Sequence, residues 1–170
     1  MQTFLKRKNI EISFQRYGIE ALASMAQGLF CSLLIGTIIN TIGSLTGLGF
    51  LVDTLATING KAYTLGDLAM AMSGPAMAVA IGYALKCPPL VLFSLVTAGF
   101  ASNALGGSGG PLAGLFVVIL TAEVGKMVSG ETKVDILMPP LVTIVLTFLV
   151  DSSSYWKSGY DFWKVDYVGD

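Results

Sequence analysis

The sequence predicts an all-α fold, a polytopic transmembrane helical bundle of about five spans whose helices are interrupted by glycine and proline. Composition gives the first reason, because 54% of the 170 residues are hydrophobic and only 12% are charged, whereas soluble domains carry about 25% charged residues. The apolar residues fall into several blocks, which excludes a soluble domain held by a single anchor. Glycine and proline stand between and within these blocks, where they end, start or bend helices.

This pattern divides the chain into three segments. Residues 1–18 are basic and suit the anionic cytoplasmic face of a membrane, as a topology signal or as a docking site for a soluble partner. Residues 19–150 form the transmembrane domain. Residues 151–170 form an aromatic-rich tail, typical of a membrane–water interface, although its alternation would also suit an edge strand. The predicted spans are residues 19–45, 65–85, 90–105, 111–128 and 138–150.

The first span is rich in small residues. Gly28, Ser32 and Gly36 fall close to one helix face, and small side chains let two backbones approach closely in lipid. We therefore expect this face to pack against another helix. Asn40 lies deep enough in the span to need a polar partner, either across a helix–helix contact or on a bound ligand.

The segment between the first two spans, residues 46–64, is expected to form an amphipathic helix on the membrane, closed by a turn at Asn59-Gly60. The second span follows, with Thr64 or Asp67 as its cap.

Two proline-containing strings shape the second span. Ser73-Gly74-Pro75 should kink or break it, because proline has no backbone N–H to donate. Lys86-Cys87-Pro88-Pro89 should end it, since two prolines cannot continue an ordinary helix.

A glycine run, Gly106 to Gly110, precedes Pro111 and breaks an otherwise apolar stretch. It is either the tight turn of a helical hairpin or a re-entrant element that lines a watery cavity. In the second case its backbone amides and neighbouring side chains could bind a substrate at the start of the next helix. Ser73-Gly74-Pro75 echoes this run, and paired interruptions of this kind point to a transporter site. The candidate substrate-binding residues here are Asn103, Gly107, Ser108 and Gly109.

Glu123 is the fifth candidate substrate-binding residue, because an acid within a membrane span is costly and is a functional candidate by default. Lys126 follows three residues later, so the two side chains can pair on one helix face. Glu123 is therefore half of an ion pair near the cytoplasmic end of the span, or a group that accepts a sugar hydroxyl or a proton.

Catalytic and metal chemistry have no support in the sequence. There are no histidines and only two cysteines. Cys31 and Cys87 lie far apart in or beside apolar blocks and are expected to be small core residues. We expect no catalytic residue, no cofactor and no metal, and no basic run is dense enough to bind nucleic acid.

The placement of Lys and Arg predicts the orientation of the chain in the membrane. With five spans, seven basic residues fall on one side and three on the other, which places the N-terminus in the cytoplasm. The larger set is Lys6, Arg7, Lys8, Arg16, Lys86, Lys126 and Lys133, and the smaller set is Lys61, Lys157 and Lys164.

Several strings resemble those of one protein family. They are Phe4 to Glu11, Arg16 to Leu22, Asn103 to Gly114, and Glu123 to Lys126 followed by Lys133 to Leu137. These strings are similar to a group of bacterial membrane proteins classed with the IIC permease components of the phosphoenolpyruvate-dependent sugar phosphotransferase system. Such permeases are longer, so the chain resembles the N-terminal half of a regulator-like subgroup.

The resemblance implies a multi-pass protein of the bacterial plasma (inner) membrane that passes a sugar inward while a soluble IIB component carries the phosphate. The implied partners are membrane lipid, the sugar, the IIB component and further copies of the chain, with no nucleic acid. Two other functions stay open. One is a membrane-embedded regulator or scaffold without transport, and the other is a proton-coupled transporter of a small solute.

Overall fold

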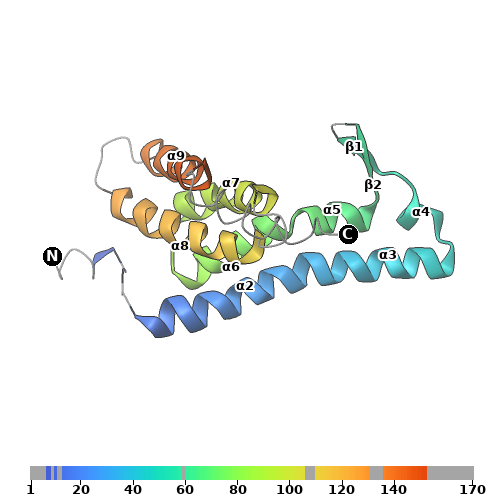
Figure 1. Cartoon of the computed structure of the whole chain (residues 1–170), viewed down its shortest axis with the longest axis horizontal. Helices are drawn as coiled ribbons and strands as arrows, with labels where there is room; N and C mark the ends of the chain where they lie inside the picture. The colour runs from blue at the N-terminus through green and yellow to red at the C-terminus, as the bar shows by residue number, and fades with distance from the viewer. Residues whose placement is uncertain are drawn as a thin grey trace, which may run out of the picture.

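The longest element of the computed structural model is a helix from Gln15 to Thr46, which runs along the rest of the chain in Figure 1. The structure describes residues 7, 8, 10, 13–58, 60–105, 110–130 and 136–152. At about 1.5 Å per residue the long helix measures about 48 Å, more than the ~30 Å hydrocarbon core of a bilayer. Its successive parts are η1 (Gln15–Glu20), α2 (Ala21–Leu29), η2 (Phe30–Leu34) and α3 (Ile35–Thr46), of which η1 and η2 are π-helical.

A bundle of further helices packs on the α2 part of the long helix (Figure 1). In it α6 contacts α2, α7 and α8, and α9 packs against α7 and α8. The core is apolar, with Met77, Ile81, Leu95 and Val118 fully buried. The helices are α5 (Leu65–Ala71), α6 (Ser73–Ala84), α7 (Pro89–Leu105), α8 (Gly110–Val128) and α9 (Met138–Ser152).

The prediction of an all-α bundle is confirmed, apart from one two-stranded hairpin. Among the described residues, Gln15–Thr46 and Pro111–Val128 are long and apolar enough to cross a membrane. The bent pair of α5 and α6 makes a third candidate span if it is counted as one. The apolar parts of α7 and α9 are shorter. The structure therefore gives two or three candidate spans by length, rather than five.

The second predicted span is broken where the sequence predicts it. α5 and α6 meet at Met72 with a bend of 46°. Pro75 explains the bend, because its nitrogen has no hydrogen to donate to the carbonyl of Ala71 and its ring crowds that carbonyl.

The predicted amphipathic helix over residues 46–64 is wrong. The long helix ends where Gly47 takes a φ of 66°, and a short helix and a hairpin follow. The short connection across Gly60, with its φ of 78°, favours a hairpin because a positive φ matches the twist of paired strands. The elements are α4 (Gly49–Val52) and the antiparallel strands β1 (Ala56–Ile58) and β2 (Lys61–Tyr63).

Close packing through small residues of the first span is confirmed. A Cβ added to Gly28 would lie 2.7 Å from the Cα of Met77 in α6, and one added to Gly36 would lie 2.7 Å from the carbonyl oxygen of Gly66 in α5. Both distances are shorter than carbon contacts allow. The long helix therefore meets α5 and α6 backbone to backbone.

The outward faces of the long helix, α8 and α9 are apolar. Phe30, Phe116 and Phe148 are more than half exposed, and extensive exposed apolar surface is rare on monomeric soluble proteins. Cys31 is exposed, so its prediction as a core residue is wrong. Cys87 is half-buried and packs against the core, as predicted.

The end of α6 has an unusual residue at its turn. The amides of Lys86 and Cys87 donate to the carbonyls of Tyr83 and Gly82, each at 3.0 Å, which is the hydrogen-bond pattern of a Schellman motif. Lys86 stands at the left-handed position of this motif, with a φ of 54°. Glycine is favoured there, and a side chain costs about 1 to 2 kcal/mol.

Candidate functional site

The broken helix places two polar side chains inside the bundle. Ser73, the first residue of α6, is buried, and Asn103 near the end of α7 donates from Nδ2 to Ser73 Oγ at 3.4 Å. The two helices touch at this level, because a Cβ on Gly74 would lie 2.6 Å from the Cβ of Asn103. A hydrogen bond of this length is weak, so both side chains can exchange it for a hydroxyl group of a ligand.

Most other buried hydroxyl groups bond to their own helix. Ser32, Ser102 and Thr121 donate to carbonyls four residues earlier at 3.0, 2.8 and 2.7 Å. Such bonds satisfy a hydroxyl group without a partner on another helix. These residues therefore serve packing, and the contact between Ser73 and Asn103 differs from them because it joins two helices.

Asn40 forms a helix–helix contact. Its Nδ2 donates to Asp67 Oδ1 at 2.9 Å, and its Oδ1 accepts from Thr64 Oγ1 at 3.0 Å. Thr64 and Asp67 also form a capping box at the start of α5, which confirms both as capping residues. Asn40 thus ties α3 to the start of α5.

A second polar cluster lies at the other end of α6. Glu123 Oε1 is 2.7 Å from Lys126 Nζ, and the lysine side chain is only 1% exposed. Lys126 also donates to the carbonyl oxygen of Leu85 at 3.2 Å, and Arg16 Nη2 donates to the same oxygen at 3.0 Å. The last carbonyls of a helix lack amide donors and carry partial negative charge, which attracts cations. The cluster therefore joins the long helix, α6 and α8.

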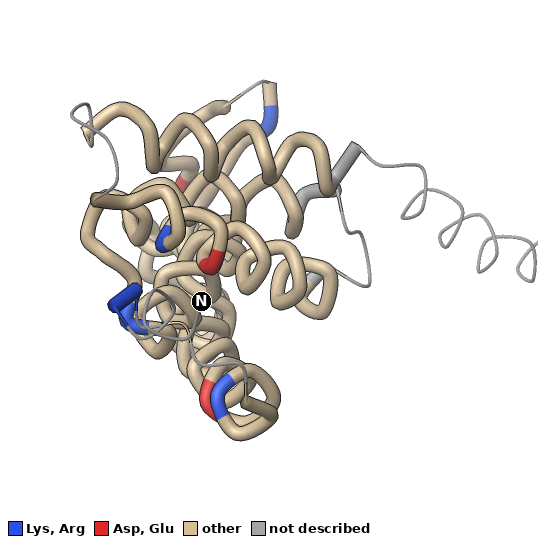
Figure 2. Tube along the Cα trace, turned by 90° about the vertical axis from the view of Figure 1, so that its left-hand side faces the viewer, with Lys and Arg blue, Asp and Glu red and all other residues tan. Residues whose placement is uncertain are grey.

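Figure 2 looks onto this end of the molecule, where blue Lys and Arg segments gather. Lys8 also belongs to this end, because its Nζ donates to the carbonyl of Ser129 after α8. Lys61 lies on the distant hairpin, over the ring of Tyr63. Among the described basic residues, Lys61 therefore lies apart from the others.

The two predicted site residues that the structure describes, Asn103 and Glu123, lie apart. Asn103 lies beside Gly74, whereas Glu123 lies with Lys126 beside Leu85. Gly74 and Leu85 are eleven residues apart on α6, or about 16 Å along its axis. Gly107, Ser108 and Gly109 lie outside the described residues.

Sequence reasoning missed Ser73 as a partner of Asn103 and Arg16 as a buried residue. The Ser73-Gly74-Pro75 string marked the break, but no pattern shows which helix crosses it. In the sequence, Arg16 belongs to the basic segment of residues 1–18, which is expected at the membrane surface. In the structure, it is buried against the end of α6. The sequence held one indication of this. The apolar residues that follow Arg16 place it at the start of the long helix rather than in a separate surface segment.

Metal and thiol chemistry gain no support from the geometry. Within the described ranges, no group of three His, Cys, Asp or Glu residues could hold a metal ion. Burial raises the pKa of the Cys87 thiol to about 12, so it stays protonated at neutral pH.

These features define a helical protein with candidate membrane spans, a broken helix and a basic end. The family model described as "Phosphotransferase system, EIIC" matches residues 19–156. The chain belongs to this family. No curated protein matches it, and no solved structure does.

Proposed function

We propose that the chain is a membrane permease subunit of a sugar phosphotransferase system. It binds a sugar and passes it inward, and a soluble EIIB component supplies the phosphoryl group. The family match carries this proposal, because residues 19–156 include all helices from α2 to α9. The absence of histidine from the chain fits a division of labour in which the phosphoryl group stays on the soluble partner.

The sugar site is proposed at the break between α5 and α6. Ser73 and Asn103 offer a hydroxyl and an amide there, which are groups that bind sugar hydroxyls. The carbonyl freed by Pro75 is a further acceptor. The run from Gly107 to Gly109 follows α7 in sequence and precedes the start of α8, and we include it with Ser108 as a further set of contacts. Broken helices form the substrate sites of many transporters.

Glu123 has a separate role in this proposal. Its pairing with Lys126 at 2.7 Å supports a structural ion pair at the basic end, and we expect a contact with the sugar only if the sugar passes this end. The same pairing accounts for Glu123 without a proton relay, because its carboxylate already has Lys126 as a partner.

The proposed setting is the bacterial plasma membrane, crossed five times, with the N-terminus in the cytoplasm. α7 and α9 serve as short spans within the bundle. The exposed apolar faces of the long helix and α9 contact lipid and a second copy of the chain.

Uptake by proteoliposomes tests the proposal. The purified chain should accumulate labelled sugar only when phosphorylated EIIB and the components that regenerate it are enclosed. Asn103→Ala should reduce uptake at least about tenfold, whereas Thr41→Ala, at an exposed position on α3, should not. Uptake that ignores phosphorylated EIIB and stops when the pH gradient is clamped would identify a proton-coupled transporter. Absence of uptake with retained EIIB binding would identify a scaffold.

A further inference from the structure

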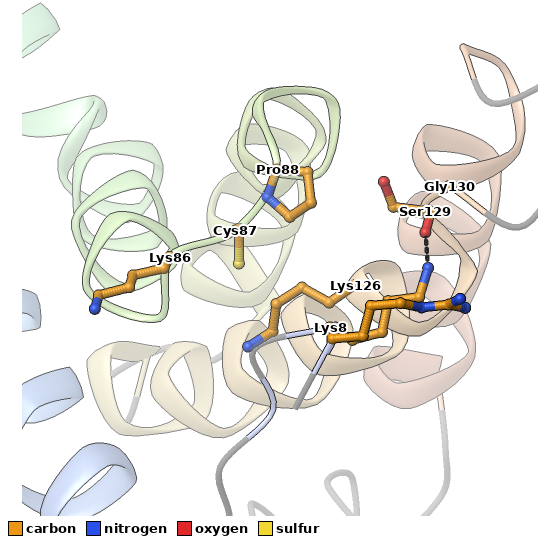
Figure 3. Close-up of a pocket in the computed structure, with 8 residues that line it drawn as sticks. Lys8, Lys86, Cys87, Pro88, Lys126, Ser129 and Gly130 are labelled. Carbon is orange, nitrogen blue, oxygen red and sulfur yellow. Dashed lines mark hydrogen bonds between the residues drawn. The ribbon is translucent and has the colours of Figure 1, made fainter. Parts of the chain in front are cut away.

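A cavity of about 500 Å³ opens at the basic end of the molecule. It lies between the loop after α6, the end of α8 and residues 7 and 8 near the N-terminus (Figure 3). Its volume falls within the range of cavities that hold small ligands. It is distinct from the contact between Ser73 and Asn103, which lies near the other end of α6.

The lining of this cavity is positively charged. Arg7, Lys8, Lys86 and Lys126 contribute to it, and none of the described lining residues is an Asp or a Glu. Helix ends explain two of these cations, because Lys126 donates to the carbonyl of Leu85 at the end of α6 and Lys8 to the carbonyl of Ser129. The side chain of Lys86 is exposed and makes no hydrogen bond or ion pair within the part of the chain that the structure describes.

Lys86 has a backbone conformation that favours glycine, so the occurrence of a lysine at this position calls for an explanation. Its φ of 54° is one that glycine adopts without strain and lysine does not. A strained residue at the rim of a cavity is a reason to look for a function of its side chain. The side chain supplies what glycine could not, a positive charge at the rim of the cavity, although Figure 3 shows it directed away from Lys8 and Lys126.

The start of α7 adds to the positive potential. Pro88 lines the cavity and α7 begins at Pro89, so the positive end of the helix dipole lies at the cavity wall. Pro88 and Pro89 have no N–H to donate, so this helix start contributes its dipole and not amide donors at those two positions. The cations and the helix start therefore favour the same kind of ligand.

We propose that this cavity binds a phosphate oxyanion, carried by a free phosphate or phosphate ester or by the headgroup of an anionic lipid. Arg7, Lys8 and Lys126 surround the cavity with positive charge, and Lys86 adds a charge at its rim. The inference does not depend on sugar transport, because it rests only on the charge and geometry of this end.

Lys86→Gly separates ligand binding from folding. It removes the charge and relieves the backbone strain, so thermal stability should stay equal or rise. Affinity for inorganic phosphate, measured by titration calorimetry on the full chain in neutral detergent at constant ionic strength, should fall about tenfold. Lys86→Arg should retain most of the affinity. Lys61→Gln, the same loss of charge at the hairpin, should leave binding unchanged.

The source of the phosphate group is distinguished by vesicles. The chain is reconstituted in phosphatidylcholine alone or with phosphatidylglycerol, and the lipids bound after extraction are counted. Retention of phosphatidylglycerol by the wild-type chain, lost in Lys86→Gly, supports a headgroup ligand. Phosphate binding in detergent with no such lipid preference supports a free phosphate or ester. The proposal is overturned if neither ligand distinguishes Lys86→Gly from wild type, or if Lys61→Gln weakens binding equally.

Discussion

The ion pair between Glu123 and Lys126 stabilises the basic end of the molecule. Lys126 is buried, and its nearest carboxylate is Glu123 at 2.7 Å. Removing one member of a buried pair leaves the other charge uncompensated, which costs roughly 3 kcal/mol. We therefore expect Glu123→Gln to lower the melting temperature in detergent clearly.

Two variants control this prediction. Glu20→Gln, at an exposed position on the long helix, should leave stability unchanged. Glu123→Gln combined with Lys126→Met should recover much of the loss, because the uncompensated charge is then absent. Unchanged stability of Glu123→Gln would show that the ion pair does not hold this end together and would return Glu123 to the candidates for ligand binding.

The thiol of Cys87 gives a prediction that depends on pH. Its pKa is raised from 9.0 to about 12, mainly by burial, while the charge of Lys126 lowers the pKa and that of Glu123 raises it. Since the thiolate is the reactive form, alkylation by N-ethylmaleimide in a Cys31→Ala background should keep rising about tenfold per pH unit up to about pH 10. The alkylation rate of an ordinary thiol levels off when the pH reaches its pKa. A plateau near pH 9 would contradict the burial of this side chain.

The helices α6 and α7 cross with their backbones in close contact. A Cβ on Gly99 would run into the carbonyl oxygen of Gly74 and the Cβ of Ala78. Backbone cannot yield as a flexible side chain can, so Gly99→Ala should destabilise the folded chain by about 3 kcal/mol. The measurement is thermal unfolding followed by circular dichroism in detergent.

Gly49→Ala is the matched control for this crossing. Its added Cβ would lie 3.2 Å from Asp53 Oδ2, which belongs to an exposed and movable side chain, so the effect should be within about 0.5 kcal/mol. Equal effects of the two substitutions would mean that the helices do not cross at Gly74 and Gly99.

Helix positions were predictable because proline and glycine separate them in the sequence. Pro75 marks the break, Pro88 and Pro89 separate α6 from α7, and Gly110 opens α8. The hairpin was not predictable from the sequence. The apolar residues from Leu48 to Ile58 suit an amphipathic helix, and the turn before Lys61 was interpreted as the end of that helix. Strand pairing depends on contacts between segments, which periodicity alone does not contain.

The facing of side chains and the polar contacts were less predictable. A helix that is apolar on all sides does not reveal which face packs, so Cys31 was assigned to the core although it is exposed. The pairing of Glu123 with Lys126 follows from their spacing on one helix. The convergence of Arg16 and Lys126 on one carbonyl requires three helices to meet, and no local pattern contains that information.

The molecule as a whole separates its described basic residues by position. Arg16, Lys86 and Lys126 lie at one end of the bundle, and Lys61 lies on the hairpin at the far end of the long helix. The long helix is longer than a bilayer is thick, so both groups can reach water on opposite sides. Positive charge is enriched on the cytoplasmic side of membrane proteins.

This arrangement predicts the result of labelling from the two sides of a membrane. In a Cys31→Ala, Cys87→Ala background, Lys61→Cys should react with a membrane-impermeant maleimide on intact cells. Lys86→Cys and Ser129→Cys should react only after the membrane is opened, because both line the cavity at the basic end. Reaction of all three positions from one side would show that the long helix does not cross the membrane. The reverse pattern would place the basic cavity outside the cell, where no soluble cytoplasmic partner could reach it.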